Sequence, residues 1–233
     1  MDEEPRWWAA LDRFEAAIGE ADLEAARAAW REAHELAEPD EPEVAYAQAR
    51  LVREEGGEEA AVPRFERVLA LDETHADAHH DLALAAEARG DHGTMIAHFQ
   101  RVRVLDAKQD RDARLGTAAE LAHIEEVARE VLAGLPPPWA ERLADVPIVL
   151  ERHPSRELVA EGFDPRSVGL FEGRNYGDED TPAPSRIVLF TCNLLIEFPE
   201  EPELSEEIEI TLLHEIGHYF GLDEDALERL GLG

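Results

Sequence analysis

Two histidines and a glutamate near the C-terminus have the types and spacing needed for metal-assisted hydrolysis. His214 and His218 are four residues apart, and Glu215 directly follows the first. On a helix, such a pair shares one face with Cβ atoms about 5–6 Å apart, so both imidazoles can bind one cation. Glu215 is rotated by about 100° from His214, which suits a base that acts on water. We therefore expect His214 and His218 to be zinc ligands and Glu215 to be the catalytic base.

The residues around this motif predict a largely buried helix. Ser205, followed by two glutamates, is typical of a helix N-cap with acidic residues in the first turn. Gly221, three residues after His218, is expected to end the helix in a left-handed turn that folds the chain back toward the metal. Burying a glutamate and two histidines is costly, which favours a functional site. Apolar residues recur at helical spacing at Ile208, Leu212, Ile216 and Tyr219.

The acidic run after the helix offers a third ligand. Glu224 is the sixth residue after His218, the place of the last histidine in the longer HExxHxxGxxH motif. A carboxylate is an acceptable zinc ligand at about 2.0–2.2 Å. Asp223 and Asp225 flank Glu224, so the choice among the three stays open, with Glu224 preferred. These acids could instead only start a short helix over residues 225–230.

Residues from about 121 to 233 resemble the small bacterial zincin-like metallopeptidases, also called minimal zincins. This resemblance implies a compact α+β fold with a small mixed sheet, a metal-dependent peptidase activity and Zn²⁺ as the metal. In that family the third ligand is usually an aspartate where this chain has Glu224. The resemblance rests on the zinc-helix motif, on Glu-Glu-Val-Ala from Glu125, Leu135–Pro136, the strand Pro147–Glu151, Gly169–Gly173, SRIVLF from Ser185 and the closing GLDEDALERLG.

The first half of the chain contains an internal repeat. RFERVLALD from Arg64 and HFQRVRVLD from His98 are offset by 34 residues, and a looser copy precedes them. A period of 34 residues with helix, glycine turn and helix resembles tetratricopeptide (TPR) repeats. Such repeats stack helix pairs around a continuous core and leave a concave face for a protein partner. We expect TPR-like all-α repeats over residues 1–115 and a zincin-like domain over residues 116–233, an α+β chain overall.

Composition limits the class of partner and the compartment. The 233 residues carry a formal charge of −32, which disfavours nucleic acids and anionic membranes as partners. The chain has one cysteine and lacks the basic, then apolar start of a signal peptide, so we expect a cytoplasmic protein. Cys192 is expected to be a core residue of a strand, and His153 to follow a strand without serving as a ligand.

Two functions from different classes fit these features. The first is a zinc-dependent peptidase whose repeats recruit a protein partner or substrate, with an extended peptide paired to the strand over residues 186–191. Arg174, Tyr176 and Tyr219 are its candidate oxyanion stabilisers. The second is a non-catalytic metal-binding scaffold for protein interactions. An intact Glu215 favours the peptidase, because a structural metal does not need a carboxylate beside its first ligand.

Overall fold

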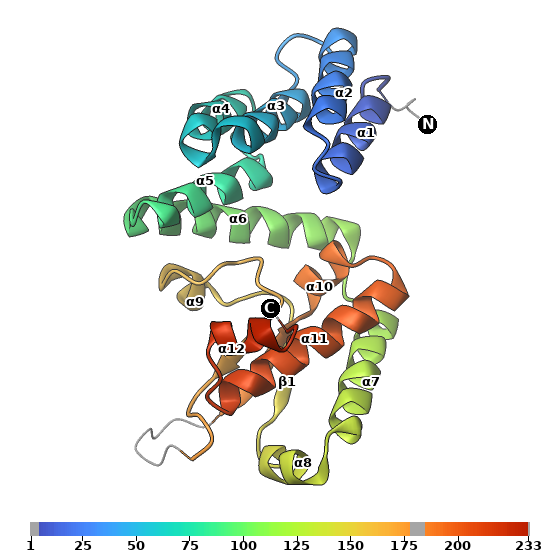
Figure 1. Cartoon of the computed structure of the whole chain (residues 1–233), viewed down its shortest axis with the longest axis vertical. Helices are drawn as coiled ribbons and strands as arrows, with labels where there is room; N and C mark the ends of the chain where they lie inside the picture. The colour runs from blue at the N-terminus through green and yellow to red at the C-terminus, as the bar shows by residue number, and fades with distance from the viewer. Residues whose placement is uncertain (1–4, 178–184, 233) are drawn as a thin grey trace. The chain divides into compact units, whose positions relative to one another are not determined.

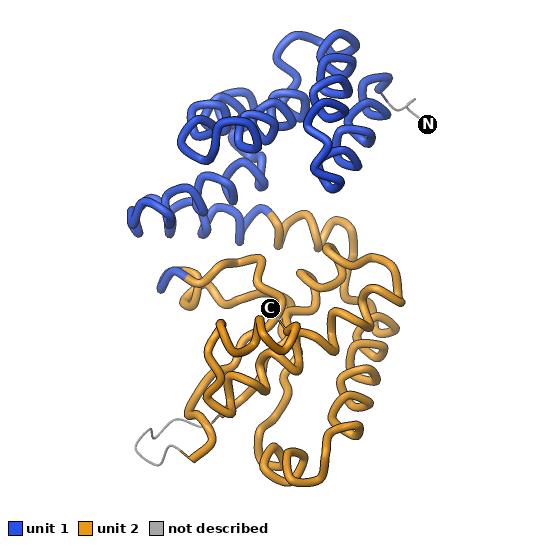
Figure 2. The backbone as a smooth tube through the Cα atoms, in the orientation of Figure 1, with its two compact units in different colours: residues 1–105, 160–162 blue, residues 106–159, 163–233 orange. Residues whose placement is uncertain are grey.

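The chain forms two compact units. The computed structural model describes residues 5–177 and 185–232. The first unit comprises residues 1–105 and 160–162, and the second comprises residues 106–159 and 163–233 (Figure 2). The domain boundary expected between residues 115 and 116 stays a prediction. None of the helices in the described ranges combines the length and apolar character needed to cross a bilayer.

Successive helices make up the first unit (Figure 1). The odd-numbered helices α1, α3 and α5 begin at residues 8, 42 and 76, steps of 34 residues that follow the sequence repeat. Within pairs, α1 packs against α2 and α3 against α4. The helical half of the predicted fold is therefore confirmed, whereas its TPR identity stays a prediction. The helices are α1 (Trp8–Gly19), α2 (Leu23–Leu36), α3 (Pro42–Gly56), α4 (Glu58–Leu71), α5 (Ala76–Ala88) and α6 (His92–Ala113), and α6 continues from residue 106 into the second unit.

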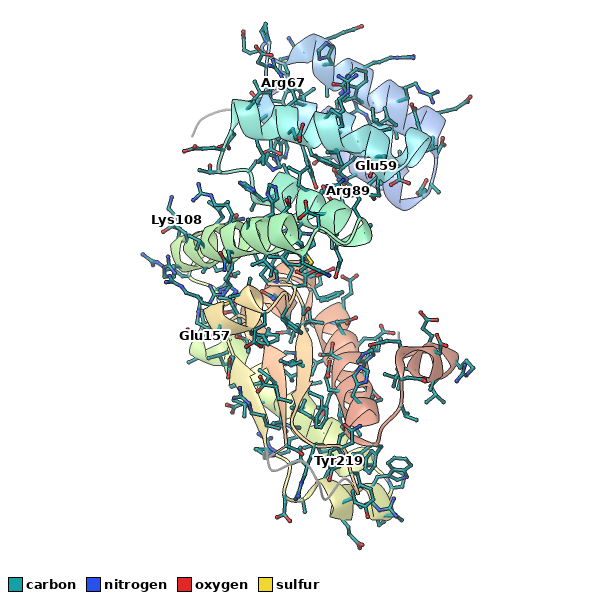
Figure 3. All side chains as sticks on the ribbon, turned by 90° about the vertical axis from the view of Figure 1, so that its left-hand side faces the viewer. Glu59, Arg67, Arg89, Lys108, Glu157 and Tyr219 are labelled. Atoms are coloured by element: carbon teal, nitrogen blue, oxygen red, sulfur yellow. The ribbon has the colours of Figure 1, made fainter. Side chains whose placement is uncertain are left out.

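A buried carboxylate ties α3 to α5 in this unit. Asp81 accepts a hydrogen bond from the Tyr46 hydroxyl at 2.8 Å and one from the Arg53 guanidinium at 2.6 Å. Burial, reinforced by the negative charge of Asp81, raises the pKa of the Tyr46 hydroxyl, so tyrosine remains a donor. At the surface, Arg89 lies 3.6 Å from Glu59 of α4 (Figure 3). Polar contacts thus supplement a core rich in alanine.

The second unit contains a small mixed sheet, as the resemblance to zincin-like metallopeptidases implies. Its strand order is β1-β3-β2, with β1 parallel and β2 antiparallel to the central β3. Helix α11 packs on β2 and β3 and against α7 (Figures 1 and 3). The elements are α7 (Ala118–Gly134), α8 (Pro137–Leu143), β1 (Ile148–Glu151), α9 (Arg156–Ala160), β2 (Gly169–Glu172), β3 (Arg186–Phe190), α10 (Thr191–Glu197), α11 (Glu201–Tyr219) and α12 (Glu224–Arg229).

Three local expectations for this unit are wrong. Helix α11 begins at Glu201, and the Ser205 hydroxyl donates to the Glu201 carbonyl at 2.9 Å inside the helix instead of capping it. Pro202 in the first turn explains the earlier start, because its fixed φ suits that position. Cys192 is buried as expected but lies in α10. Strand β3 is paired on both sides, so it has no edge for a peptide.

Glycine at position 169 lets α11 approach β2 closely. A Cβ atom built on Gly169 would lie 2.5 Å from Thr211 Cγ2 and 3.0 Å from Glu215 Oε1. Both neighbours are buried on α11, where they have little room to move. Gly169 therefore sets the distance between the sheet and α11, the helix that carries the histidines.

Gly169→Ala should lower the free energy of unfolding by about 1–3 kcal/mol, because the added methyl group overpacks the contact between α11 and β2. Chemical denaturation of the purified proteins measures this change. Gly134→Ala is the control, since a Cβ atom there meets nothing within 4 Å. Equal stability of the Gly169→Ala protein and the parent would contradict the close approach.

Candidate metal centre

The end of α11 turns the chain back over the two histidines. Gly221 has φ of 80°, the left-handed conformation that glycine adopts at little cost. The Gly221 N–H donates to the His218 carbonyl at 2.9 Å, and the Leu222 N–H donates to the Gly217 carbonyl at 3.0 Å. This pair of bonds is a Schellman motif. The predicted left-handed stop at Gly221 is confirmed, and α12 begins three residues later.

Backbone carbonyls orient both imidazole rings. His214 Nδ1 lies 2.5 Å from the Leu232 carbonyl oxygen, and His218 Nδ1 lies 3.1 Å from the Leu222 carbonyl oxygen. A carbonyl only accepts, so each Nδ1 carries a proton, and a neutral ring then keeps its lone pair on Nε2. The two Nε2 atoms are 2.9 Å apart. Two lone pairs facing each other repel unless a cation lies beside them, so this arrangement favours metal binding.

Glu224, at the start of α12, is the carboxylate nearest to this histidine pair. Its Oε1 lies 3.3 Å from His218 Nε2 and its Oε2 lies 3.7 Å from His214 Nε2. One ligand atom from each of these three residues lies within 4.8 Å of the others. Asp223 instead caps α12, accepting from the Ala226 N–H at 3.0 Å. Of the three acids left open by the sequence, the geometry groups Glu224 with the histidines.

Glu215 lies beside the histidines and is largely withdrawn from water. It is 7% exposed, and burial raises the pKa of its carboxyl, partly opposed by the two neighbouring histidines. The backbone N–H of Phe171 in β2 also faces this carboxylate and acts against burial, lowering the pKa. A buried carboxyl whose pKa is raised on balance is suited to accept a proton from water.

The histidines, Glu215 and Glu224 line one cleft of about 550 Å³, together with Gly169, Leu170, Phe171 and Asn175. The three residues that the sequence suggests as oxyanion stabilisers line a separate cavity of about 1020 Å³. Tyr219, labelled at the end of α11 in Figure 3, donates its hydroxyl to the Arg142 carbonyl at 3.1 Å. The geometry therefore does not bring Arg174, Tyr176 or Tyr219 into the histidine cleft.

This cleft lies within a segment that comparison with known families recognises. Residues 143–233 match the family described as zincin-like metallopeptidase. We call residues 143–233 the zincin-like segment. It contains the sheet, α11, α12 and every residue of the histidine cleft. No curated protein matches the chain.

Sequence reasoning missed several groups of the zincin-like segment. The Leu222 and Leu232 carbonyls and the Phe171 N–H act through backbone atoms, which no residue type reveals. Asn175 lines both cavities and lies between the candidates Arg174 and Tyr176, but the sequence analysis did not name it as a site residue. Only the loop position of Asn175 beside an arginine and a tyrosine could have drawn attention to it.

Gly217→Ala should loosen α12 over the histidines. A Cβ atom on Gly217 would lie 2.4 Å from Leu227 Cδ2, and Leu227 is the fully buried residue of α12. We expect backbone amides of α12 to exchange with deuterium about tenfold faster, a loss of about 1.4 kcal/mol of local stability. Hydrogen exchange by mass spectrometry measures this change. Unchanged exchange in α12, with Gly134→Ala as the reference, would show that the clash is absorbed elsewhere.

Proposed function

We propose that this protein is a zinc-dependent peptidase. The observation that carries the proposal is the pair of opposed Nε2 atoms, 2.9 Å apart, with both rings held from behind by carbonyls. Neutral histidine nitrogens and a carboxylate are the donors that zinc takes in catalytic sites with three protein ligands. The match of residues 143–233 to zincin-like metallopeptidases agrees with this chemistry.

The donor set fits a zinc ion held by His214, His218 and Glu224. Two rings with fixed tautomers and one carboxylate offer their ligand atoms within 4.8 Å of one another. When bound, zinc supplies a Lewis acid that polarises a carbonyl and lowers the pKa of water to about 7. Leu232 and Leu222 orient the rings through their carbonyls, a supporting role that keeps both lone pairs directed at the cation.

Glu215 is proposed as the general base. Its carboxylate accepts a proton from the attacking water and then delivers it to the leaving amine of the cleaved peptide. Burial withdraws the carboxyl from bulk water and raises its pKa, while the Phe171 N–H that faces it lowers the pKa. Asn175 lines the same cleft and its amide can donate to the oxygen of the carbonyl under attack.

The substrate is proposed to be an extended peptide that adds to β2. In the described sheet, β2 pairs with β3 on one side only. Apart from the Phe171 N–H, which faces Glu215, the backbone groups of its other edge can pair with a peptide. Gly169, Leu170 and Phe171 of β2 line the histidine cleft. A peptide paired to this edge would present its carbonyl groups beside Glu215, a role that the fully paired β3 cannot serve.

The remaining parts of the proposal concern the repeats and the compartment. We propose that the N-terminal helical pairs act as TPR-like repeats that recruit a protein partner or the substrate, because their helix starts recur every 34 residues. We propose a cytoplasmic location because the chain contains a single cysteine and so cannot form an intrachain disulfide. The strongly negative chain disfavours nucleic acids and anionic membranes as partners.

Zinc content tests the ligand set. The parent should bind one Zn²⁺ at this centre, His214→Ala should lose it, and Glu224→Ala should hold it at least tenfold more weakly, because each removes one of three ligands. Asp223→Ala and Asp225→Ala should change the affinity little and serve as matched controls. Competition with a chromogenic chelator measures these affinities. Retention in Glu224→Ala with loss in either aspartate variant would move the third ligand to that aspartate.

Glu215→Gln tests the chemistry separately from metal binding. This variant should retain zinc but lose about 10²–10⁴-fold in kcat/KM, because an amide cannot accept the proton. Digestion of a peptide library, read by mass spectrometry, compares the zinc-loaded parent with Glu215→Gln and with Glu206→Gln. Glu206 is an exposed residue of the same helix, so its variant should cleave like the parent.

Cleavage by Glu215→Gln at the parental rate would contradict the base assignment. A zinc-loaded parent that cleaves no peptide in the library would favour the second candidate function, a metal-binding scaffold for protein interactions. Removal of the metal with a chelator should abolish cleavage by the parent, and added Zn²⁺ should restore it.

A further inference from the structure

A second cluster of metal-ligating side chains lies in the interior of the second unit. Asp110 near the end of α6, His153 after β1 and Cys192 in the first turn of α10 are all buried. One ligand atom from each lies within 4.8 Å of the other two. His153 Nε2 is 3.1 Å from Asp110 Oδ2, and both side chains are less than 5% exposed. Carboxylate oxygen, imidazole nitrogen and thiol sulfur therefore meet out of contact with water.

Asn193, the residue after Cys192, fixes the tautomer of His153. The side-chain amide of Asn193 donates Nδ2 to the Pro165 carbonyl at 2.8 Å and to the Ser167 carbonyl at 2.6 Å. Both donor positions are thereby used, so Asn193 Oδ1 is the atom that faces His153 Nδ1 at 3.2 Å. That oxygen only accepts, and His153 Nδ1 must carry the proton.

His153 Nε2 then faces a carboxylate and needs a positive charge beside it. A neutral ring would direct its lone pair at Asp110 Oδ2, 3.1 Å away, inside a low-dielectric interior. Either a second proton on the ring or a metal ion can supply the charge. A protonated ring accounts for one oxygen of Asp110 and leaves the thiol of Cys192 without a role.

One further atom favours the metal ion. Among the described residues, Asp110 Oδ1 is buried without a hydrogen-bond partner. A buried carboxylate oxygen without a donor is costly, whereas a cation bound by the carboxylate compensates both oxygens. Thiolate sulfur with imidazole nitrogen selects zinc or a similar borderline ion over Mg²⁺ and Ca²⁺, which take oxygen ligands.

We propose that Asp110, His153 and Cys192 bind a second metal ion of the zinc type, separate from the histidine cleft of α11. Binding releases the Cys192 thiol proton to solvent as the sulfur becomes a thiolate. Because all three ligands are buried, the ion is structural: it joins α6, the segment after β1 and α10. Asn193 extends its effect to the Pro165 and Ser167 carbonyls, just before β2. The site thereby stabilises the strand beside Glu215.

The test uses the single cysteine of the chain. Cobalt bound to a thiolate absorbs in the near ultraviolet by charge transfer from sulfur, and only Cys192 can provide that sulfur. The full-length chain is stripped of metal and titrated with Co²⁺ as the parent and as the His214→Ala/His218→Ala variant, which lacks the first centre. Both should develop the charge-transfer band, and the parent should bind one more cobalt than the variant.

Cys192→Ser should lose the band and one metal ion while keeping the centre of α11. If this variant fails to fold, the reactivity of the Cys192 thiol provides the test. In mild denaturant, bound Zn²⁺ should slow the reaction of that thiol with a thiol reagent at least tenfold. The same slowing is expected in the parent and in the His214→Ala/His218→Ala variant. Absence of the band in both the parent and that variant, with zinc leaving thiol reactivity unchanged, would overturn the proposal and assign His153 and Asp110 to a buried ion pair. Because the variant lacks His214 and His218, failure here is distinguishable from failure of the proposed peptidase.

Discussion

The repulsion between two imidazole lone pairs is the constraint on which the histidine cleft depends. His214 and His218 could relieve it by rotating, but the Leu232 and Leu222 carbonyls hold each Nδ1 and keep the Nε2 atoms 2.9 Å apart. Both carbonyls belong to the chain that returns after Gly221. The turn therefore brings a carboxylate near the histidines and also supplies the acceptors that direct their nitrogens.

Helix α11 also carries Glu215, and the constraint on this residue is burial. The carboxyl of Glu215 would have an ordinary pKa if water surrounded it. The close approach of β2 buries the carboxyl, and burial raises its pKa. A side chain at position 169 would separate the strand from α11. Because Gly169 has no Cβ atom, close packing there contributes to the raised pKa of Glu215, 46 positions later in the sequence.

Buried polar groups recur in the interior of both units, each with its own means of compensation. Asp81 in the first unit receives donors from an arginine and a tyrosine. Asp110 in the second unit faces an imidazole and a thiol, with one oxygen lacking a hydrogen-bond partner among the described residues. The first arrangement is complete with protein donors, whereas the proposed cation would complete the second. This difference distinguishes a polar contact that only stabilises a fold from one that also selects a ligand.

Local sequence determined the elements of this protein because their signals involve near neighbours. Spacing of four residues put His214 and His218 on one helical face, Gly221 ended that helix, and the 34-residue period set the helix starts of the first unit. Strands β1 and β3 likewise fall in the segments over residues 147–151 and 186–191 that the sequence analysis takes as strands.

Tertiary structure alone decided which distant groups meet. The central position of β3, the role of Asp223 as a cap beside Glu224, and the meeting of Asp110 with His153 and Cys192 each join segments whose contacts depend on how the whole unit packs. Backbone carbonyls and N–H groups are identical in every residue type, so the sequence could not show that Leu222, Leu232 and Phe171 orient the cleft. Side-chain types reveal which chemistry is available, whereas backbone direction and close packing determine where it is used.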